Sequence, residues 1–182
     1  MIRIQTPLTK EIVEQLKCGD QVLLTGTLYT SRDAGHKRMI EQIKNNQPLP
    51  FPIQESILYY VGPAPAREGE VIGSAGPTTS YRMDEFTPTL LELGLRGMIG
   101  KGNRNQDVVD SMIKNKAIYF GAVGGAAALL ANCIKKSEVI AYEDLGPEAL
   151  RKLYVEDFPV TVVIDSKGDN LYKIAKEKYV RK

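Results

Sequence analysis

Apolar residues along this chain fall into two alternating patterns. Short continuous apolar runs, typical of buried strands, occur at residues 22–26, 57–62, 71–75, 95–100 and 117–122. Between these runs, apolar residues recur every three or four positions, which predicts helices at residues 10–17, 83–93 and 106–114 and another that opens near residue 124. Four further segments continue the alternation, at residues 138–142, 147–154, 160–165 and 170–172.

Capping signals support two of the helices. Thr9 stands where the N-cap of helix 10–17 is expected, and Ser31 or Asp33 can cap a helix whose apolar stripe is Met39, Ile40 and Ile43. The alternation of strand and helix signals predicts a mixed α/β fold with helices packed on a sheet. Since no linker, repeat or charge run interrupts the pattern, we expect one domain over residues 1–182.

Composition narrows the choice of partners. The chain has 24 basic and 22 acidic residues, a formal charge of +2, so its balance gives no reason to expect nucleic acid or an anionic membrane as a partner. The amino-terminal residues lack the apolar core of a signal peptide, and the most apolar stretch, 117–131, is too short and too rich in glycine to span a bilayer. We therefore expect a cytoplasmic protein.

The two cysteines, Cys18 and Cys133, are far apart in sequence and form no C-x-x-C motif. Reduced thiols are the ordinary interpretation of such a pair in the cytoplasm. Two thiolates are also too few for an iron–sulfur cluster, which normally takes three or four. We predict no metal ligands in this chain.

The first candidate site is the segment from Ser31 to Arg38, which enters a helix directly after a strand. The planar fork of Arg32 suits a carboxylate, and free backbone N–H groups at the start of a helix attract anions. Asp33 and His36 belong to the same segment, and His36 lies one helical turn after Arg32. The alternative is a solvated basic helix start in which His36 only makes structural hydrogen bonds.

The second candidate site follows a Gly-Pro turn at residues 76–77. Thr78, Thr79 and Ser80 place three hydroxyls in a row, and Arg82 follows them at a helix start. Hydroxyls beside an arginine make an anion pocket, although runs of hydroxyls more commonly cap helices. The residue pattern leaves both interpretations open.

Two glycine-rich segments complete the candidates. Lys101 lies between Gly100 and Gly102, so it can approach a ligand closely or belong to a plain turn; the segment does not match the phosphate-binding loop G-x-x-x-x-G-K-[ST]. The turn from Gly121 to Gly125 resembles a dinucleotide-binding turn, but its spacing is G-x-x-G-G instead of G-x-G-x-x-G. A nucleotide-binding module therefore stays a remote alternative to close helix–sheet packing.

Taken together and in order, these motifs resemble one family. The segments TGTLYTSRDAGHKR, GPTTSYRMD, IGKGN and FGAVGGAAALLA, with the ending EDLGPEALRKLYVEDFP, are similar to the C-terminal region, or β subunit, of class I iron–sulfur fumarate hydratases and L-tartrate dehydratases. The resemblance implies a swivelling β/β/α domain with a central mixed sheet and flanking helices. It also implies an α subunit whose three cysteines hold a [4Fe–4S] cluster, an α₂β₂ assembly when the regions are separate chains, and inactivity of this chain alone.

The resemblance also implies roles for the candidate residues. Arg32, Arg82 and Lys101 would hold the carboxylates of a small dicarboxylate substrate, and Thr78 would remove the proton from C3 of malate. The open iron of the cluster would act as a Lewis acid on the leaving hydroxyl. Thr79, Ser80, Asp33, His36, Gly100 and Gly102 would support these groups.

The substrate choice rests on differences within the family. The segments DAGHKR, RMD and VEDFP resemble the fumarase branch, whereas the serine that follows Thr79 leans toward tartrate dehydratase. We therefore predict the β subunit of a fumarate hydratase, with the tartrate enzyme as the alternative. A scaffold that only stabilises its partner is a third hypothesis, which alanine variants at the site would separate from the other two.

Overall fold

The computed structural model describes residues 1–122 and 127–180. The strands are β1 (Ile2–Gln5), β2 (Gln21–Thr30), β3 (Ile57–Tyr59), β4 (Gly97–Gly100), β5 (Ile118–Ala122), β6 (Ile134–Ala141) and β7 (Leu150–Ile164). The helices are α1 (Lys10–Gln15), α2 (Asp33–Lys44), α3 (Thr87–Glu92), α4 (Gln106–Asn115), α5 (Ala127–Asn132) and α6 (Leu171–Val180), with 3₁₀ turns η1 (Ser80–Met83) and η2 (Glu143–Glu148). The mixed α/β architecture with a central sheet and flanking helices is confirmed. The single-domain assignment stays a prediction.

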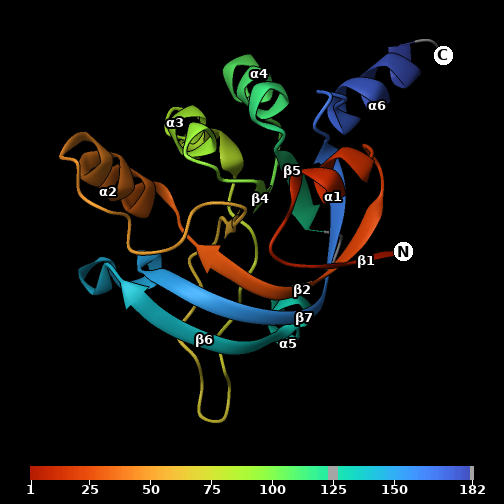
Figure 1. Cartoon of the computed structure of the whole chain (residues 1–182). Coiled ribbons are helices and arrows are strands. Elements are labelled where there is room, and N and C mark those ends of the chain that lie inside the picture. Colours follow the sequence, from red (N-terminus) through yellow and green to blue (C-terminus); the bar gives the residue numbers. More distant parts are fainter. Residues whose placement is uncertain (123–126, 181–182) are drawn as a thin grey trace.

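Five strands close on themselves into a barrel-like sheet. β2, β3, β4 and β5 run parallel, and antiparallel β7 pairs with both β5 and β2 to complete the ring. β1 adds to β2 in parallel, and β6 adds to β7 in antiparallel orientation. Figure 1 shows β2, β7 and β6 curving together below the row of helices α2, α3 and α4.

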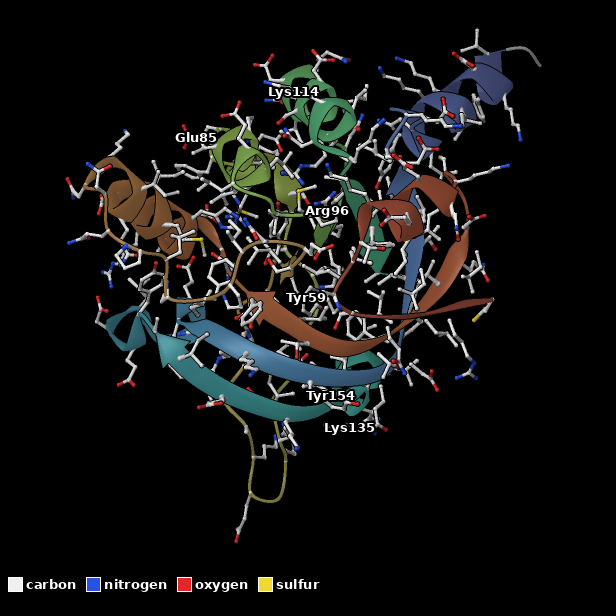
Figure 2. The ribbon with its side chains drawn as sticks, viewed as in Figure 1. Tyr59, Glu85, Arg96, Lys114, Lys135 and Tyr154 are labelled. Carbon is white, nitrogen blue, oxygen red and sulfur yellow. The ribbon has the colours of Figure 1, made fainter. Side chains whose placement is uncertain are left out.

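Apolar side chains fill both faces of the parallel strands. Along the β3 run, Ile57, Tyr59 and Val61 belong to the core inside the closed sheet, while Leu58 and Tyr60 belong to the core beneath the helices. Successive side chains of a strand point to opposite faces, so a strand buried on both faces appears as an uninterrupted apolar run. In Figure 2, Tyr59 lies above β2 and β7, on the inner side of the sheet.

The segment 147–154 does not add a separate element between two strands, because Leu150 begins the 15-residue strand β7. Leu150 packs under the helices and Leu153 packs inside the closed sheet, so their spacing of three reflects two buried faces and only imitates a helical repeat. Tyr154 remains exposed on the side of the molecule opposite Lys114 of α4 (Figure 2).

The predicted strand at residues 71–75 is wrong. This segment belongs to the long loop that projects from the body between β3 and η1 (Figure 1), closed by a hydrogen bond from the Ala64 N–H to the Ser74 carbonyl. Ile72 and Ala75 are buried against the inner core, which accounts for the apolar run without any pairing to the sheet.

Helix starts follow the capping signals in part: the N-cap of α2 is Arg32 without a side-chain cap bond, so the prediction of Ser31 or Asp33 as cap is wrong. The hydroxyl of Thr9 accepts a hydrogen bond from Ile12 N at 3.2 Å, as predicted for α1. The predicted helix 83–93 is shorter in the structure: η1 ends at Met83 and α3 begins only at Thr87, with Pro88 in its first turn. The start of the helix expected from residue 124 lies outside the described residues, and α5 is described from Ala127. Among the described helices, none is long and apolar enough to cross a membrane.

Candidate functional site

The carboxyl ends of β2, β3 and β4 lie at one edge of the sheet, because the three strands are parallel neighbours. In α/β folds, ligands bind at this edge. The loop after β2 contains Ser31 and Arg32 and leads into Asp33, the first residue of α2, and the loop after β4 contains Lys101 and Gly102. The candidate residues of both loops therefore share one edge of the sheet.

The segment with the three hydroxyls fills the space between these loops. Thr78 N–H donates to the Tyr60 carbonyl at 2.7 Å, and Lys101 N–H donates to the Thr78 carbonyl at 3.2 Å. The Ser80 N–H in turn donates to the Lys101 carbonyl at 2.8 Å, and Thr79 and Lys101 form a parallel bridge. Thr78 and Lys101 are thus brought together by direct backbone pairing.

Arg32 reaches the same edge from the other side. Its loop is anchored by Ser31 N–H, which donates to the Tyr59 carbonyl at 3.1 Å. The Arg32 side chain packs over Gly62, where a Cβ would come within 2.5 Å of its Nη1 atom. Arg32 keeps 29% of its side-chain surface exposed, and its Nε lies 4.0 Å from a carboxylate oxygen of Glu148. A carboxylate from outside the chain can therefore still reach this guanidinium.

Arg82 lies next to the Arg32 loop, with its Nε 3.7 Å from the Asp33 carboxylate. The arginine is 40% exposed and borders a hollow of about 650 Å³ whose lining includes four carboxylates, those of Asp33, Asp84, Glu85 and Asp107. Because like charges repel, the hollow itself does not suit a dianion. Asp33 must share Arg82 with any carboxylate that binds there.

The amino end of α2 already holds an acidic side chain. Glu148, from η2, accepts a hydrogen bond from Ala34 N at 3.2 Å and lies beside Arg32. A carboxylate at a helix start satisfies free N–H groups and is stabilised by the helix dipole. Glu148 therefore already occupies part of the anion-binding site that was expected at residues 31–38.

His36 is fully buried within this loop. Its Nδ1 lies 2.8 Å from the Ser31 hydroxyl and 2.9 Å from the Arg32 carbonyl, and its ring packs against Tyr60. Burial lowers the pKa of His36 to about 4, although the bond to the Arg32 carbonyl opposes the shift. The side chain is neutral at pH 7 and orders the backbone on which Arg32 sits.

This burial predicts that the fold loses stability in mild acid. The unfolded histidine takes up a proton near its ordinary pKa of 6.5, whereas the native one resists protonation down to about 4, so stability falls as pH drops through that interval. We expect a loss of about 2 kcal/mol between pH 7 and pH 5. Urea titrations should show a flatter dependence for His36→Asn, which removes the chain's single histidine; parallel curves would contradict this assignment.

The supporting residues fix the shape of the two central loops. A Cβ at Gly100 would overlap the hydroxyl oxygen of Ser80, so only glycine allows this close approach. Gly102 adopts a φ of +89°, a left-handed conformation that favours glycine. The hydroxyl of Ser80 lies 2.7 Å from that of Tyr119 on β5.

Sequence reasoning missed the charged group beneath these loops. The side chain of Arg104 is fully buried and its Nε lies 2.6 Å from the Asp84 carboxylate. Tyr119 and Glu148 were also missed as parts of the site. Nothing in the turn 103–105 distinguishes a buried arginine from an exposed one, since its partners Thr87 and Asp84 lie 17 and 20 residues away along the chain.

Gly121, the first residue of the predicted glycine turn, lies within β5 and has a packing role. A Cβ at Gly121 would come within 2.9 Å of Val163 on β7, so this glycine permits close strand packing. Gly124 and Gly125, the other glycines of the proposed nucleotide turn, lie outside the described residues. No observation in the described part of the chain supports a nucleotide.

The cysteines do not suit a metal cluster. Cys18 Sγ donates to the Val163 carbonyl, and Cys133 Sγ lies near the Leu129 carbonyl. Burial, with nearby Asp165, raises the pKa of Cys18 to about 11, and burial raises that of Cys133. Thiols that stay protonated are poor ligands. Within residues 1–122 and 127–180, no three His, Cys, Asp or Glu side chains gather as a metal site.

Comparison with known proteins gives a match over nearly the whole chain. The family described as "Fumarase C-terminus" matches residues 1–175. The chain is 39% identical to fumarate hydratase 2 of Leishmania major and 40% identical to the aerobic class I fumarate hydratase of Escherichia coli K12, covering 94% and 90% of this chain but 31% of each relative. It is 38% identical to the putative L(+)-tartrate dehydratase subunit beta of Methanocaldococcus jannaschii, covering 96% of this chain and 93% of that relative.

Proposed function

This chain belongs to the fumarase C-terminus family, and from that premise we propose that it is the β subunit of an iron–sulfur fumarate hydratase. In this role it holds the substrate's carboxylates and accepts the proton, while a separate α subunit holds the [4Fe–4S] cluster. The chain spans about a third of the length of the fumarate hydratases it matches, so its activity and its partner are both part of what we propose.

One observation carries the proposal: four candidate residues meet at a single sheet edge. Thr78 and Lys101 are joined through their backbones, and Arg82 lies against Asp33, the residue that follows Arg32. A small dicarboxylate carries two negative charges, and the three cations can share them. Arginine forks and a lysine also discriminate against monocarboxylates, which leave at least one cation without a partner.

The chain's own chemistry in this reaction is proton transfer. The hydrogen at C3 of malate is acidified by the neighbouring carboxylate, and its removal leaves negative charge that Arg32, Arg82 and Lys101 stabilise. We assign the acceptor role to Thr78, which directly precedes Thr79, the residue that forms the parallel bridge with Lys101. Because a threonine hydroxyl is a poor base, this role requires the field of the cations or an acidic group from the partner.

The cluster is assigned to the partner because the cysteines of this chain do not suit it. Cys18 and Cys133 are held protonated at different places in the fold. Alignment over 93% of a relative named as a beta subunit supports a separate cluster-bearing chain. We propose an α₂β₂ assembly in which the active site lies between the two kinds of subunit.

L-tartrate dehydration is the second candidate function. A relative named as a tartrate dehydratase subunit is 38% identical, against 33 to 41% for the relatives named as fumarate hydratases. Overall similarity therefore does not favour either substrate. The segments around Asp33, Asp84 and Asp157 favour fumarate, as argued from the sequence.

Mixing experiments test this assignment. The isolated chain should show no turnover of malate, fumarate or L-tartrate, and anaerobic mixing with an α subunit carrying a reconstituted cluster should restore hydration of fumarate, followed by absorbance. Faster turnover of tartrate than malate would select the alternative. Full activity of the isolated chain would refute the division between subunits, and a specific thermal shift with NAD or ATP would revive the nucleotide-binding alternative.

A further inference from the structure

A buried arginine lies beneath the two loops that contain Thr78 and Lys101. Arg104 donates from Nη2 to the Thr87 hydroxyl at 2.9 Å and pairs through Nε with Asp84 at 2.6 Å. Its guanidinium also faces the rings of Tyr60 and Tyr119, at 5.2 and 5.0 Å from their centroids. Cation–π contacts of this kind gain strength when they are shielded from water.

Three of these partners, Tyr60, Asp84 and Tyr119, are bonded to the loops of the site. Tyr60 accepts the Thr78 N–H at its carbonyl, and Asp84 directly follows η1 and accepts the Asn105 N–H at 2.9 Å. Asp84 therefore joins the end of the Thr78 segment to the end of the Lys101 loop. Arg104 connects both loops to the strands below them.

Tyr119 closes a ring of hydrogen bonds through the Lys101 loop. Its hydroxyl donates to the Gly102 carbonyl at 2.8 Å and lies 2.7 Å from the Ser80 hydroxyl. Because the Tyr119 hydroxyl donates its proton to the Gly102 carbonyl, its oxygen must accept the proton of the Ser80 hydroxyl. The Ser80 oxygen in turn accepts the Lys101 N–H at 3.1 Å. The hydrogen bonds thus run from the Lys101 N–H through Ser80 and Tyr119 to the carbonyl of the next residue, Gly102.

The direction of this ring does not change with pH in the physiological range. Burial raises the pKa of the Tyr119 hydroxyl well above its ordinary value, against the opposing effects of Ser80 and Arg104. The tyrosine therefore remains a donor to Gly102. Buried networks in which every member is satisfied hold their parts in one arrangement.

We propose that Tyr119, supported by Arg104, is a positioning residue that fixes Lys101 and Thr78 in one rigid unit at the site. This inference rests on the proposed function and deepens it. Tyr119 is buried and acts through the backbone of the Lys101 loop and through Ser80. Small displacements of a positioned group are enough to reduce the rate by large factors.

Tyr119→Phe tests the proposal by removing one oxygen while keeping the ring over Arg104. In the isolated chain, amide hydrogen exchange of Lys101 and Ser80 should become at least fivefold faster, since their loop loses its hydroxyl anchor. Tyr29→Phe is the matched control, because this buried tyrosine lies on the outer face of β2 and packs against Phe51. Equal exchange in the two variants would overturn the proposal.

A double-mutant cycle separates positioning from general loss of structure. In the assembled enzyme, Tyr119→Phe should lower kcat/KM about tenfold, and by a smaller factor when Lys101 is already alanine, because part of the effect passes through the Lys101 side chain. The same tenfold loss in both backgrounds would overturn the proposal. If no assembly containing the wild-type chain turned over a dicarboxylate, the proposed function would fail, and the exchange rates alone would decide whether Tyr119 anchors the loop.

Arg104→Lys provides a second test that keeps the positive charge. Lysine lacks the planar group that lies against both tyrosines and donates to Asp84 and Thr87 together. It should reproduce the faster exchange of the Lys101 amide. The control is Arg96→Lys, a buried arginine before β4 whose Nη1 reaches the Lys116 carbonyl at the opposite ends of the strands (Figure 2). Unchanged Lys101 exchange in Arg104→Lys would contradict the supporting role of Arg104.

Discussion

Replacing Thr78 with alanine should lower kcat of the assembled enzyme by about 10²- to 10⁴-fold, the range that a positioned proton acceptor contributes. KM should stay within about threefold of the wild type, because Arg32, Arg82 and Lys101 still hold the carboxylates. The loss is expected at the proton-transfer step. We therefore expect exchange of the C3 hydrogen of malate with deuterated solvent, followed by NMR, to fall in parallel with kcat.

The reason for a selective effect lies in how Thr78 is held. Its N–H and carbonyl are both paired, with Tyr60 and with Lys101, so alanine keeps the backbone in place and removes only the hydroxyl and methyl groups. Thr78→Ser should recover much of the rate, since it restores the hydroxyl. Thr89→Ala is a suitable control, because Thr89 is exposed on α3. Turnover within threefold of the wild type in Thr78→Ala would assign the proton to another group.

Replacing Arg104 with methionine should have the largest effect on stability. Asp84 would then be left buried without its counter-charge. Removing one partner of a buried ion pair lowers the free energy of unfolding by about 3–5 kcal/mol. The rings of Tyr60 and Tyr119 would also lose the cation between them. We expect this loss in the free energy of unfolding measured by urea titration at pH 7.

A second arginine–aspartate pair provides the comparison. Arg38 and Asp144 form two hydrogen bonds of 2.6 and 2.7 Å, yet their charges lie at the surface. Exposed pairs contribute little because water and salt screen them. Arg38→Met should therefore destabilise the fold far less than Arg104→Met. Equal losses in the two variants would show that burial of the Arg104–Asp84 pair is not what matters.

Local sequence signals predicted those parts of the fold that depend on neighbours in the chain. The Thr9 cap and the doubly buried β3 run follow from single residues and from periodicity. The candidate residues Arg32 and Lys101 follow parallel strands whose pairing brings their loops to one edge. Thr78 was identified after a predicted strand at residues 71–75 that the structure does not contain, and its backbone bonds to Tyr60 and Lys101 bring it to the same edge. Their roles in substrate binding and proton transfer came from the family resemblance and remain predictions.

Long-range pairing accounts for what the sequence did not show. Leu150 and Leu153 imitate a helical repeat until their pairing partners in β2 and β6 are known. Ile72 and Ala75 are apolar because they cover the inner core, which no local signal separates from a strand. Arg104 is a charged residue in a polar turn, and only the fold places it between two tyrosines. Such positions depend on contacts that periodicity does not encode.

The pairing of β2 with β7 has a consequence for how the chain acquires its structure. Residues 21–29 meet residues 152–161, so the ring closes only across most of the chain's length. Contacts this distant in sequence slow folding, and during synthesis on the ribosome β2 and β5 both present unpaired edges until β7 emerges. A nascent chain that stalls before residue 150 would therefore expose two unpaired strand edges at once, so strand β7 protects the earlier part of the chain from aggregation.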